Sequence, residues 1–135
     1  MGRVVALDHG TSRIGIAVSD ALGLTAQPFG MISVASGLFD ELRELLGQWE
    51  VDTIVVGLPI GLDGREGAAA AAARGFAAEV AAATGHHTIL YDERFSTVVA
   101  ERAMIEGGAR RDRRRRGRDA VAAAVFLQGY LDGGR

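Results

Sequence analysis

The chain has 135 residues and a formal net charge of −2, and 48% of its residues are hydrophobic. This length is typical of one domain, and the apolar fraction is enough for one buried core, so we expect a single domain over residues 1–135. There is no cysteine, which excludes disulfides, thiolate catalysis and cysteine-ligated zinc. All 15 basic residues are arginine, which excludes Schiff-base lysine chemistry and a P-loop lysine.

The sequence has no signal-peptide pattern, and no apolar run approaches the roughly 18 residues of a membrane span, so we expect a cytoplasmic protein without a membrane partner. The charge is unevenly divided along the chain. Residues 1–109 hold 7 arginines and 14 acidic residues, a balance of −7, whereas residues 110–135 hold 8 arginines and 3 acidic residues, a balance of +5. A basic segment on an acidic body indicates contact with a polyanion.

Five short apolar runs bounded by turn residues predict strands, and the first two lie close enough for a hairpin. Helical spacing predicts a helix after the third strand, with Ser36 as a candidate N-cap, and an alanine-rich helix ended by Thr84-Gly85. Strands followed by strand–helix alternation predict an α/β domain, a mixed sheet of about five strands flanked by helices. The predicted strands are Arg3–Leu7, Ile14–Ser19, Phe29–Val34, Thr53–Gly57 and His87–Tyr91, and the predicted helices are Gly37–Glu50, about Glu66–Ala83, Val98–Ile105 and Asp119–Leu131.

Carboxylates stand at the ends of two predicted strands. Asp8 closes the first strand and shares a face with Val4 and Ala6, because side chains alternate along a strand. Asp92 and Glu93 follow the last strand and alternate to opposite faces, so only one of them points where Asp8 points. The carboxyl ends of strands are where sites collect in α/β sheets.

A third acid, Asp119, begins the last predicted helix. Its face continues through small and apolar residues at offsets of three, four, seven and eleven, which indicates that this face turns toward the core. The residues on that face are Ala122, Ala123, Phe126 and Tyr130.

Each acid also has an ordinary structural explanation: a turn former, a favourable charge at a helix start, or a salt bridge with Arg94. Taken together, they suggest a cluster of oxygen ligands without His or Cys, which suits Mg²⁺ or Mn²⁺. Two such ions about 4 Å apart would clamp the attacking and leaving oxygens of a phosphodiester during hydrolysis.

Four motifs in order carry a resemblance that spans nearly the whole chain. The sequence resembles the bacterial YqgF/RuvX family, described as a Holliday junction resolvase and as a nuclease maturing the 5′ end of 16S ribosomal RNA. The resemblance implies an RNase H-like fold and a catalytic, metal-binding triad of Asp8, Glu93 and Asp119, which selects Glu93 over Asp92. The motifs are D-H-G-T-S-R-I-G-I-A-V-S-D (Asp8–Asp20), V-V-G-L-P (Val55–Pro59) with D-G at Asp63-Gly64, D-E-R-F-S-T (Asp92–Thr97) and D-A-V-A-A-A-V-F-L-Q-G-Y-L (Asp119–Leu131).

Two positions depart from the family pattern. Ser12 stands before Arg13 where the family usually has a basic residue, which weakens the expected phosphate contact there. Ser96 replaces a usual threonine and keeps its hydroxyl.

Arginines supply the candidate substrate contacts. The segment Ala109–Arg118 is a charge run without apolar periodicity, which predicts a mobile loop. Seven arginines lie in Arg110–Arg118, and one guanidinium group can donate two hydrogen bonds to the oxygens of one phosphate. Near the proposed acids they indicate binding of nucleic acid through its backbone, and the resemblance implies that this nucleic acid is pre-rRNA or branched DNA. A solvated charge run is the alternative. The candidate substrate-binding residues are Arg13, Arg94, Arg113, Arg114, Arg115 and Arg116.

Three elements carry less information. The turn G-L-P-I-G-L-D-G (Gly57–Gly64) is either a rigid rim of the site or plain loop chemistry. His9 stands beside Asp8 and could touch substrate, whereas His86 and His87 receive no role.

Two rival functions remain from the residues. D-H-G-T-S also resembles the phosphate-binding hairpin of actin-like and sugar kinases, which close two such domains over a nucleotide, and tight ATP binding would favour that class. A non-catalytic nucleic-acid-binding module would tend to lose its acids, and this chain keeps three. A metal-dependent nuclease is therefore the preferred interpretation, and cutting a junction would require paired active sites in a homodimer.

Overall fold

A five-stranded mixed sheet forms the centre of the computed structural model, which describes residues 2–95 and 111–134, with the backbone alone at 111–119 and 134. The strand order within these residues is β3-β2-β1-β4-β5. β1 pairs antiparallel with β2, which pairs antiparallel with β3, while β4 lies parallel to β1 and β5 parallel to β4. The predicted mixed sheet is confirmed. Its strands are β1 (Arg3–His9), β2 (Arg13–Ser19), β3 (Ala26–Ser33), β4 (Val51–Leu58) and β5 (Thr88–Asp92).

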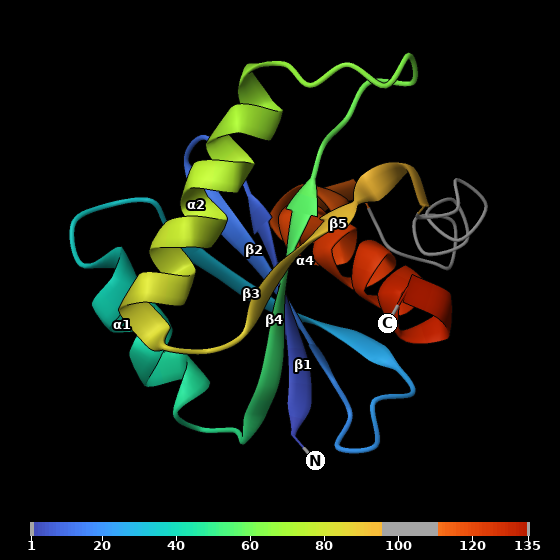
Figure 1. Cartoon of the computed structure of the whole chain (residues 1–135). Helices are drawn as coiled ribbons and strands as arrows, with labels where there is room; N and C mark the ends of the chain where they lie inside the picture. Colours follow the sequence, from blue (N-terminus) through green and yellow to red (C-terminus); the bar gives the residue numbers. More distant parts are fainter. Residues whose placement is uncertain (1, 96–110, 135) are drawn as a thin grey trace.

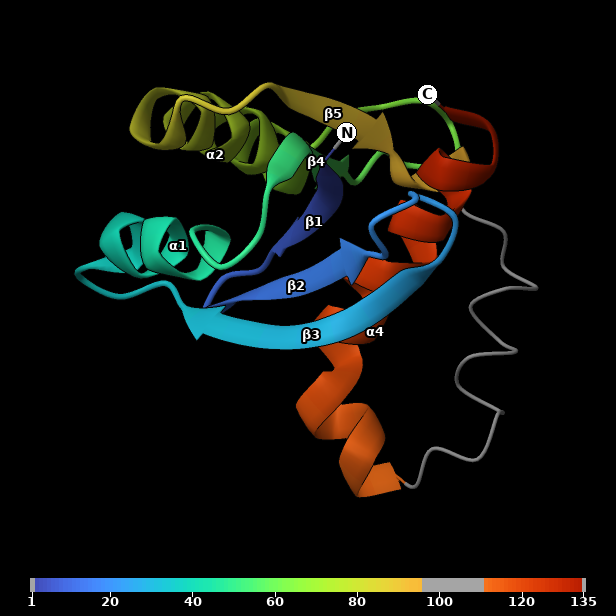
Figure 2. The same ribbon diagram turned by 90° about the horizontal axis from the view of Figure 1, so that it is seen from below.

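Helices cover both faces of the sheet. Figures 1 and 2 show α1 (Leu38–Leu46) and α2 (Ala68–Thr84) together on one face and α4 (Arg111–Gly129) on the other. Two short turns complete the described chain: the 3-10 turn η1 (Glu93–Phe95) directly after β5, and the π-helical turn η2 (Tyr130–Gly134) after α4. The layers are therefore helix, sheet, helix.

Alternation along the strands builds two separate apolar clusters. On the α1–α2 face, Val5 and Leu7 of β1 pack with Phe76 and Val80 of α2. On the α4 face, two residues that alternate with them along β1 pack against buried residues of α4 and η2. The β1 residues are Val4 and Ala6, the α4 residues include Ala123 and Phe126, and the η2 residue is Tyr130. The prediction that this stripe faces the core is confirmed for Ala123, Phe126 and Tyr130, which are buried, whereas Ala122 is half-buried.

Besides this apolar packing, one polar side chain of α4 joins the helix to the start of β3. Gln128 Oε1 accepts a hydrogen bond from the Ala26 backbone N–H at 2.9 Å, and its Nε2 donates to the Leu24 carbonyl at 3.1 Å. These contacts join residues about a hundred positions apart in the chain and fix where α4 crosses β2 and β3. Within the described chain, no helix has the length and apolar character that crossing a membrane requires.

Two local predictions were wrong. The charge run before Asp119 is not a loop over 111–118, because α4 begins at Arg111. Arginine ranks high in helix propensity, and a helix nucleated by its buried C-terminal half extends through such residues at little cost. The N-cap of α1 is Gly37 instead of Ser36, with no side-chain capping bond. The predicted end of α2 is confirmed, since Gly85 takes a left-handed φ of 72°, and the predicted helix Val98–Ile105 lies outside the described residues.

Candidate metal site at the carboxyl edge of the sheet

Asp8 stands near the end of β1, on the face that α4 covers. Its neighbours at alternate positions, Val4 and Ala6, both belong to the cluster beneath α4. Across the hairpin Asp8 pairs with Gly15 of β2. On its other side, the parallel pairing of β1 with β4 ends at Leu7 and Val56, one residue before Asp8 and Gly57. The Asp8 side chain is half-buried.

Glu93 approaches the same edge from β5. Tyr91 pairs with Gly57 of β4 and is buried beneath α4, so alternation turns Glu93 toward the α4 face. The contact geometry agrees, because a Cβ atom placed on Gly57 would lie 2.8 Å from Glu93 Oε1. The carboxylate of Glu93 therefore lies against the end of β4, the strand between β1 and β5.

Asp92 alternates with Glu93, and its carboxylate binds Arg94, two residues further along the chain. Its Oδ1 accepts the Arg94 backbone N–H at 2.9 Å, and its carboxylate pairs with the Arg94 guanidinium, with Nη2 to Oδ2 at 2.7 Å. The hydrogen bond from the Arg94 side chain lowers the pKa of Asp92, and the same contact raises the pKa of Arg94. The choice left open between the two acids is thus decided in space: Asp92 stabilises η1, and Glu93 faces α4.

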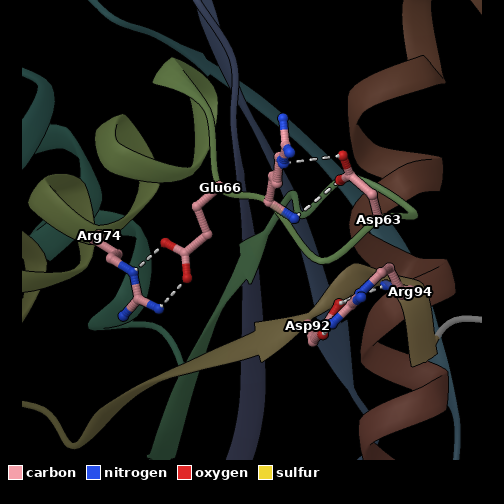
Figure 3. A network of polar contacts seen from close by, with 6 residues as sticks. Asp63, Glu66, Arg74, Asp92 and Arg94 are labelled. Atoms are coloured by element: carbon pink, nitrogen blue, oxygen red, sulfur yellow. Dashed lines mark hydrogen bonds and ion pairs between the residues drawn. The ribbon is translucent and has the colours of Figure 1, made fainter.

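The loop between β4 and α2 carries two further ion pairs, Asp63 with Arg65 and Glu66 with Arg74 (Figure 3). Asp63 accepts the Arg65 backbone N–H at 3.0 Å, and Gly61 N–H donates to the Arg65 carbonyl at 2.9 Å. Glu66 holds Arg74 of α2 through two 2.7 Å hydrogen bonds, which lower the pKa of Glu66. The turn predicted from Gly57–Gly64 is therefore closed by its own hydrogen bonds.

Asp119 lies on α4, within the part described by its backbone alone. The part of α4 that lies nearest to Gly57 is Phe126, because a Cβ on Gly57 would lie 2.7 Å from Phe126 Cε2, as it would lie 2.8 Å from Glu93 Oε1. Asp119 precedes Phe126 by seven residues, about two helical turns or 10 Å along the same helix. The assignment of Asp119 to the site stays a prediction.

The candidate substrate residues occupy different surroundings. Arg13 is exposed at the start of β2, beside the hairpin closed by a 2.9 Å bond from the Gly10 N–H to the Arg13 carbonyl. Arg94 is engaged with Asp92. The remaining candidates, Arg113, Arg114, Arg115 and Arg116, lie in the first turns of α4, which project past the sheet in Figure 2.

His9 does not join the carboxylates. Its ring stacks on Phe76 of α2 with centroids 4.6 Å apart, on the face opposite to α4. Burial lowers the pKa of His9, and Glu79 opposes that shift. His9 thus belongs to the packing of α2 on the sheet.

The donor chemistry at this edge fits a hard divalent cation. The two described acids facing α4 offer only carboxylate oxygens, the ligands that Mg²⁺ and Mn²⁺ prefer. Among the residues whose side chains are described, no group of three His, Cys, Asp or Glu is close enough to hold a metal ion. A complete site therefore requires a further ligand, and Asp119 is the one that the sequence proposes.

The close approach of Glu93 and Phe126 to Gly57 was not predicted from the sequence, where Gly57 appeared as the last residue of a strand and the first of a turn. The available signal was a glycine at the end of the apolar run T-I-V-V-G, since an isolated glycine in a strand pattern marks close approach of another group. Only the fold shows which groups approach it.

Known proteins are similar to this chain over nearly its whole length. The model of the RuvX family, described as Holliday junction resolvase, matches residues 2–133. A protein of Anaeromyxobacter sp. (strain Fw109-5) with the name "Putative pre-16S rRNA nuclease" is 48% identical over 97% of both chains. A protein of Geobacillus kaustophilus (strain HTA426) with the same name is 43% identical, over 98% of this chain and 99% of its own.

Among solved structures, the chain is similar to RuvC of T. thermophilus in complex with Holliday junction substrate. The TM-score is 0.62 at 17% sequence identity, with 99% of this chain and 97% of that chain covered. At this identity the likeness shows the fold, which is RNase H-like.

Proposed function

Because the chain belongs to the RuvX family, we propose that it is a nuclease that hydrolyses phosphodiester bonds of structured nucleic acid. The observation that supports the proposal is that Asp8 and Glu93 both lie at the carboxyl edge of the sheet on the α4 face, on the two sides of the end of β4. Relatives that are 43–48% identical are named for pre-16S rRNA. We therefore take the 5′ end of 16S pre-rRNA, in the cytoplasm, as the first substrate and branched DNA as the second.

Asp8, Glu93 and Asp119 are the residues that would hold divalent cations in this proposal. Mg²⁺ or Mn²⁺ bound there, as a pair of ions, would supply positive charge against the negative charge that develops on the phosphate. The protein's own contribution is placement. β1 carries Asp8, the turn after β5 carries Glu93, and α4 carries Asp119, so each acid comes from a separate element of the fold.

Arginines bring the polyanion to this acidic edge. A carboxylate cluster repels phosphate, so a nearby positive field is needed for substrate to approach. Arg13 is exposed at the start of β2, and the arginines of the first turns of α4 precede Asp119 on the same helix. Contacts of this kind bind the backbone and position the substrate without reading its sequence.

A panel of structured substrates tests the proposal. The purified protein is incubated with 16S precursor RNA, with mature-ended RNA and with four-way DNA junctions, in Mg²⁺, in Mn²⁺ and in excess EDTA, beside Glu93→Gln as a control. We expect cation-dependent cleavage of the precursor RNA that the variant lacks. Cleavage that persists in EDTA would refute the cation requirement, and binding without cleavage under all conditions would favour the non-catalytic module.

Junction cleavage sets one further condition. Two symmetric cuts need two active sites, so an enzyme that resolves junctions should bind them as a homodimer. The mass of the protein–junction complex by light scattering measures this. A monomer on precursor RNA is compatible with RNA maturation alone.

A further inference from the structure

Gly57 occupies a buried position in β4 where a side chain would normally contribute to the core. Its backbone does not require glycine, because Gly57 is not among the glycines with positive φ. A glycine inside a strand weakens that strand through backbone entropy and lost packing. Some other constraint therefore favours the missing side chain.

The space beside Gly57 is filled by two groups from different elements. A Cβ atom there would lie 2.8 Å from Glu93 Oε1, and 2.7 and 2.9 Å from Phe126 Cε2 and Cζ. Real Cβ atoms do not approach other heavy atoms within 3.0 Å. Even one methyl group at Gly57 would therefore have to displace the Glu93 carboxylate, the Phe126 ring or both.

These two groups belong to the two elements that must be held in register at the proposed metal site. Glu93 begins the turn η1 after β5, and Phe126 is a fully buried residue of α4, the helix that also carries Asp119. Gly57 lies on β4, between β1 with Asp8 and β5. One position thus touches the carboxylate directly and the α4 helix through an aromatic ring.

We propose that Gly57 is a positioning residue: its missing side chain leaves the space in which the Glu93 carboxylate lies against the sheet, and so sets where the Glu93 oxygens stand relative to α4. This inference rests on the proposed function, in which the Glu93 carboxylate is a ligand of a divalent cation. The competing explanation is packing alone, in which Gly57 only makes room for the Phe126 ring.

The test uses the full chain and Mn²⁺ alone, without nucleic acid. Gly57→Ala is compared with Gly30→Ala, a strand glycine of β3 whose added Cβ would meet nothing within 4 Å. Calorimetric titration measures Mn²⁺ affinity. We expect Gly57→Ala to lose roughly tenfold or more, the loss typical when a group that orients a metal ligand is disturbed, and Gly30→Ala to bind like the wild type.

A second variant separates positioning from packing. Phe126→Leu removes the two ring atoms nearest to Gly57, so in Gly57→Ala/Phe126→Leu the added methyl group meets chiefly the carboxylate. We expect the double variant to melt close to Phe126→Leu alone and still to bind Mn²⁺ weakly. Recovery of wild-type Mn²⁺ affinity in the double variant would overturn the proposal and leave packing as the role of Gly57. If Gly57→Ala does not fold, the double variant is measured against Phe126→Leu.

A readout in the metal-free protein keeps this inference distinct from the proposed function. The ¹³C carboxyl resonance of Glu93, assigned with Glu93→Gln, should shift in Gly57→Ala and not in Gly30→Ala. If Glu93→Gln binds Mn²⁺ as well as the wild type, the proposed metal site is wrong, and the resonance still decides whether Gly57 positions Glu93. An unmoved resonance in Gly57→Ala would overturn the positioning role.

Discussion

Asp92 and Arg94 form a two-point ion pair beside the turn that carries Glu93. The Arg94 Nε lies 3.1 Å from each carboxylate oxygen of Asp92, and Nη2 lies 2.7 Å from Oδ2. The same carboxylate accepts the Arg94 backbone N–H. Asp92 thus binds both the backbone and the side chain of Arg94 and stabilises η1, the turn that begins with Glu93.

Removing that support should lower activity without removing a proposed ligand. We expect Asp92→Ala to reduce cleavage by about tenfold, a typical cost for losing a group that orients a metal ligand, and Glu93→Gln to cost more. Cleavage rates and Mn²⁺ titrations measure both. Asp63→Ala is the matched control, because Asp63 closes the neighbouring loop. Equal losses in the Asp63 and Asp92 variants would contradict a specific role for Asp92.

Neutralising any proposed ligand should abolish most of the hydrolysis. Asp8→Asn, Glu93→Gln and Asp119→Asn each keep shape and remove one charge, and we expect cleavage to fall at least about a hundredfold in each. Substrate binding should persist, since fewer acids repel phosphate less. Single-turnover cleavage and filter binding measure the two effects separately. A wild-type cleavage rate in Asp119→Asn would exclude Asp119 from the site. This variant is the most informative of the three, because only the backbone of α4 locates Asp119.

The arginines at the start of α4 should set the salt dependence of binding. Replacing Arg113, Arg114, Arg115 and Arg116 with glutamine keeps good helix formers and removes four charges. Each phosphate contact contributes about 0.7 to 0.9 to the slope of log affinity against log salt. Not all four will engage, so we expect the slope to fall by about two, for every sequence tested.

The control for this variant is Arg43→Gln, on α1 at the opposite face of the sheet. It should leave the slope unchanged. Thermal unfolding of the quadruple variant should stay near that of the wild type, because the replaced residues precede the buried half of α4. An unchanged slope in the folded quadruple variant would mean that these arginines are only solvated.

Acid should destabilise the packing of α2 through His9. Burial against Phe76 lowers the pKa of His9 from its ordinary 6.5, so the unfolded chain binds this proton more readily than the folded one. The stabilisation is complete above pH 6.5 and is lost as the pH falls from there through the lower, folded-state pKa. Urea unfolding between pH 5 and pH 8 should show this loss.

The variant His9→Phe keeps a ring against Phe76 and carries no proton. We expect it to flatten the part of the stability–pH curve that lies below pH 6.5. If the free energy of unfolding depends on pH in the same way in both proteins, protonation of His9 does not destabilise the folded state.

Most strands and helices, and the faces on which Asp8 and Phe126 lie, follow from local patterns in this sequence. Apolar alternation in β1 places Asp8 on the face of the sheet opposite to that of Leu7. Helical spacing places Phe126 and Tyr130 on the side that faces the core. Such patterns are local because an element with one buried face repeats its apolar residues every two positions in a strand and about every 3.6 positions in a helix. The extension of α4 to Arg111 was not predicted, because arginines with no apolar period give no signal of burial, although they continue a helix readily.

Only the tertiary structure decided what meets at the edge of the sheet. Sequence left Asp92 and Glu93 equivalent until a family resemblance chose between them, whereas the fold separates them through the Arg94 pair and the space at Gly57. That space is defined by a strand, a turn and a helix that lie far apart in the chain. Contacts between such distant segments depend on packing in three dimensions, and no local pattern in the amino-acid sequence encodes them.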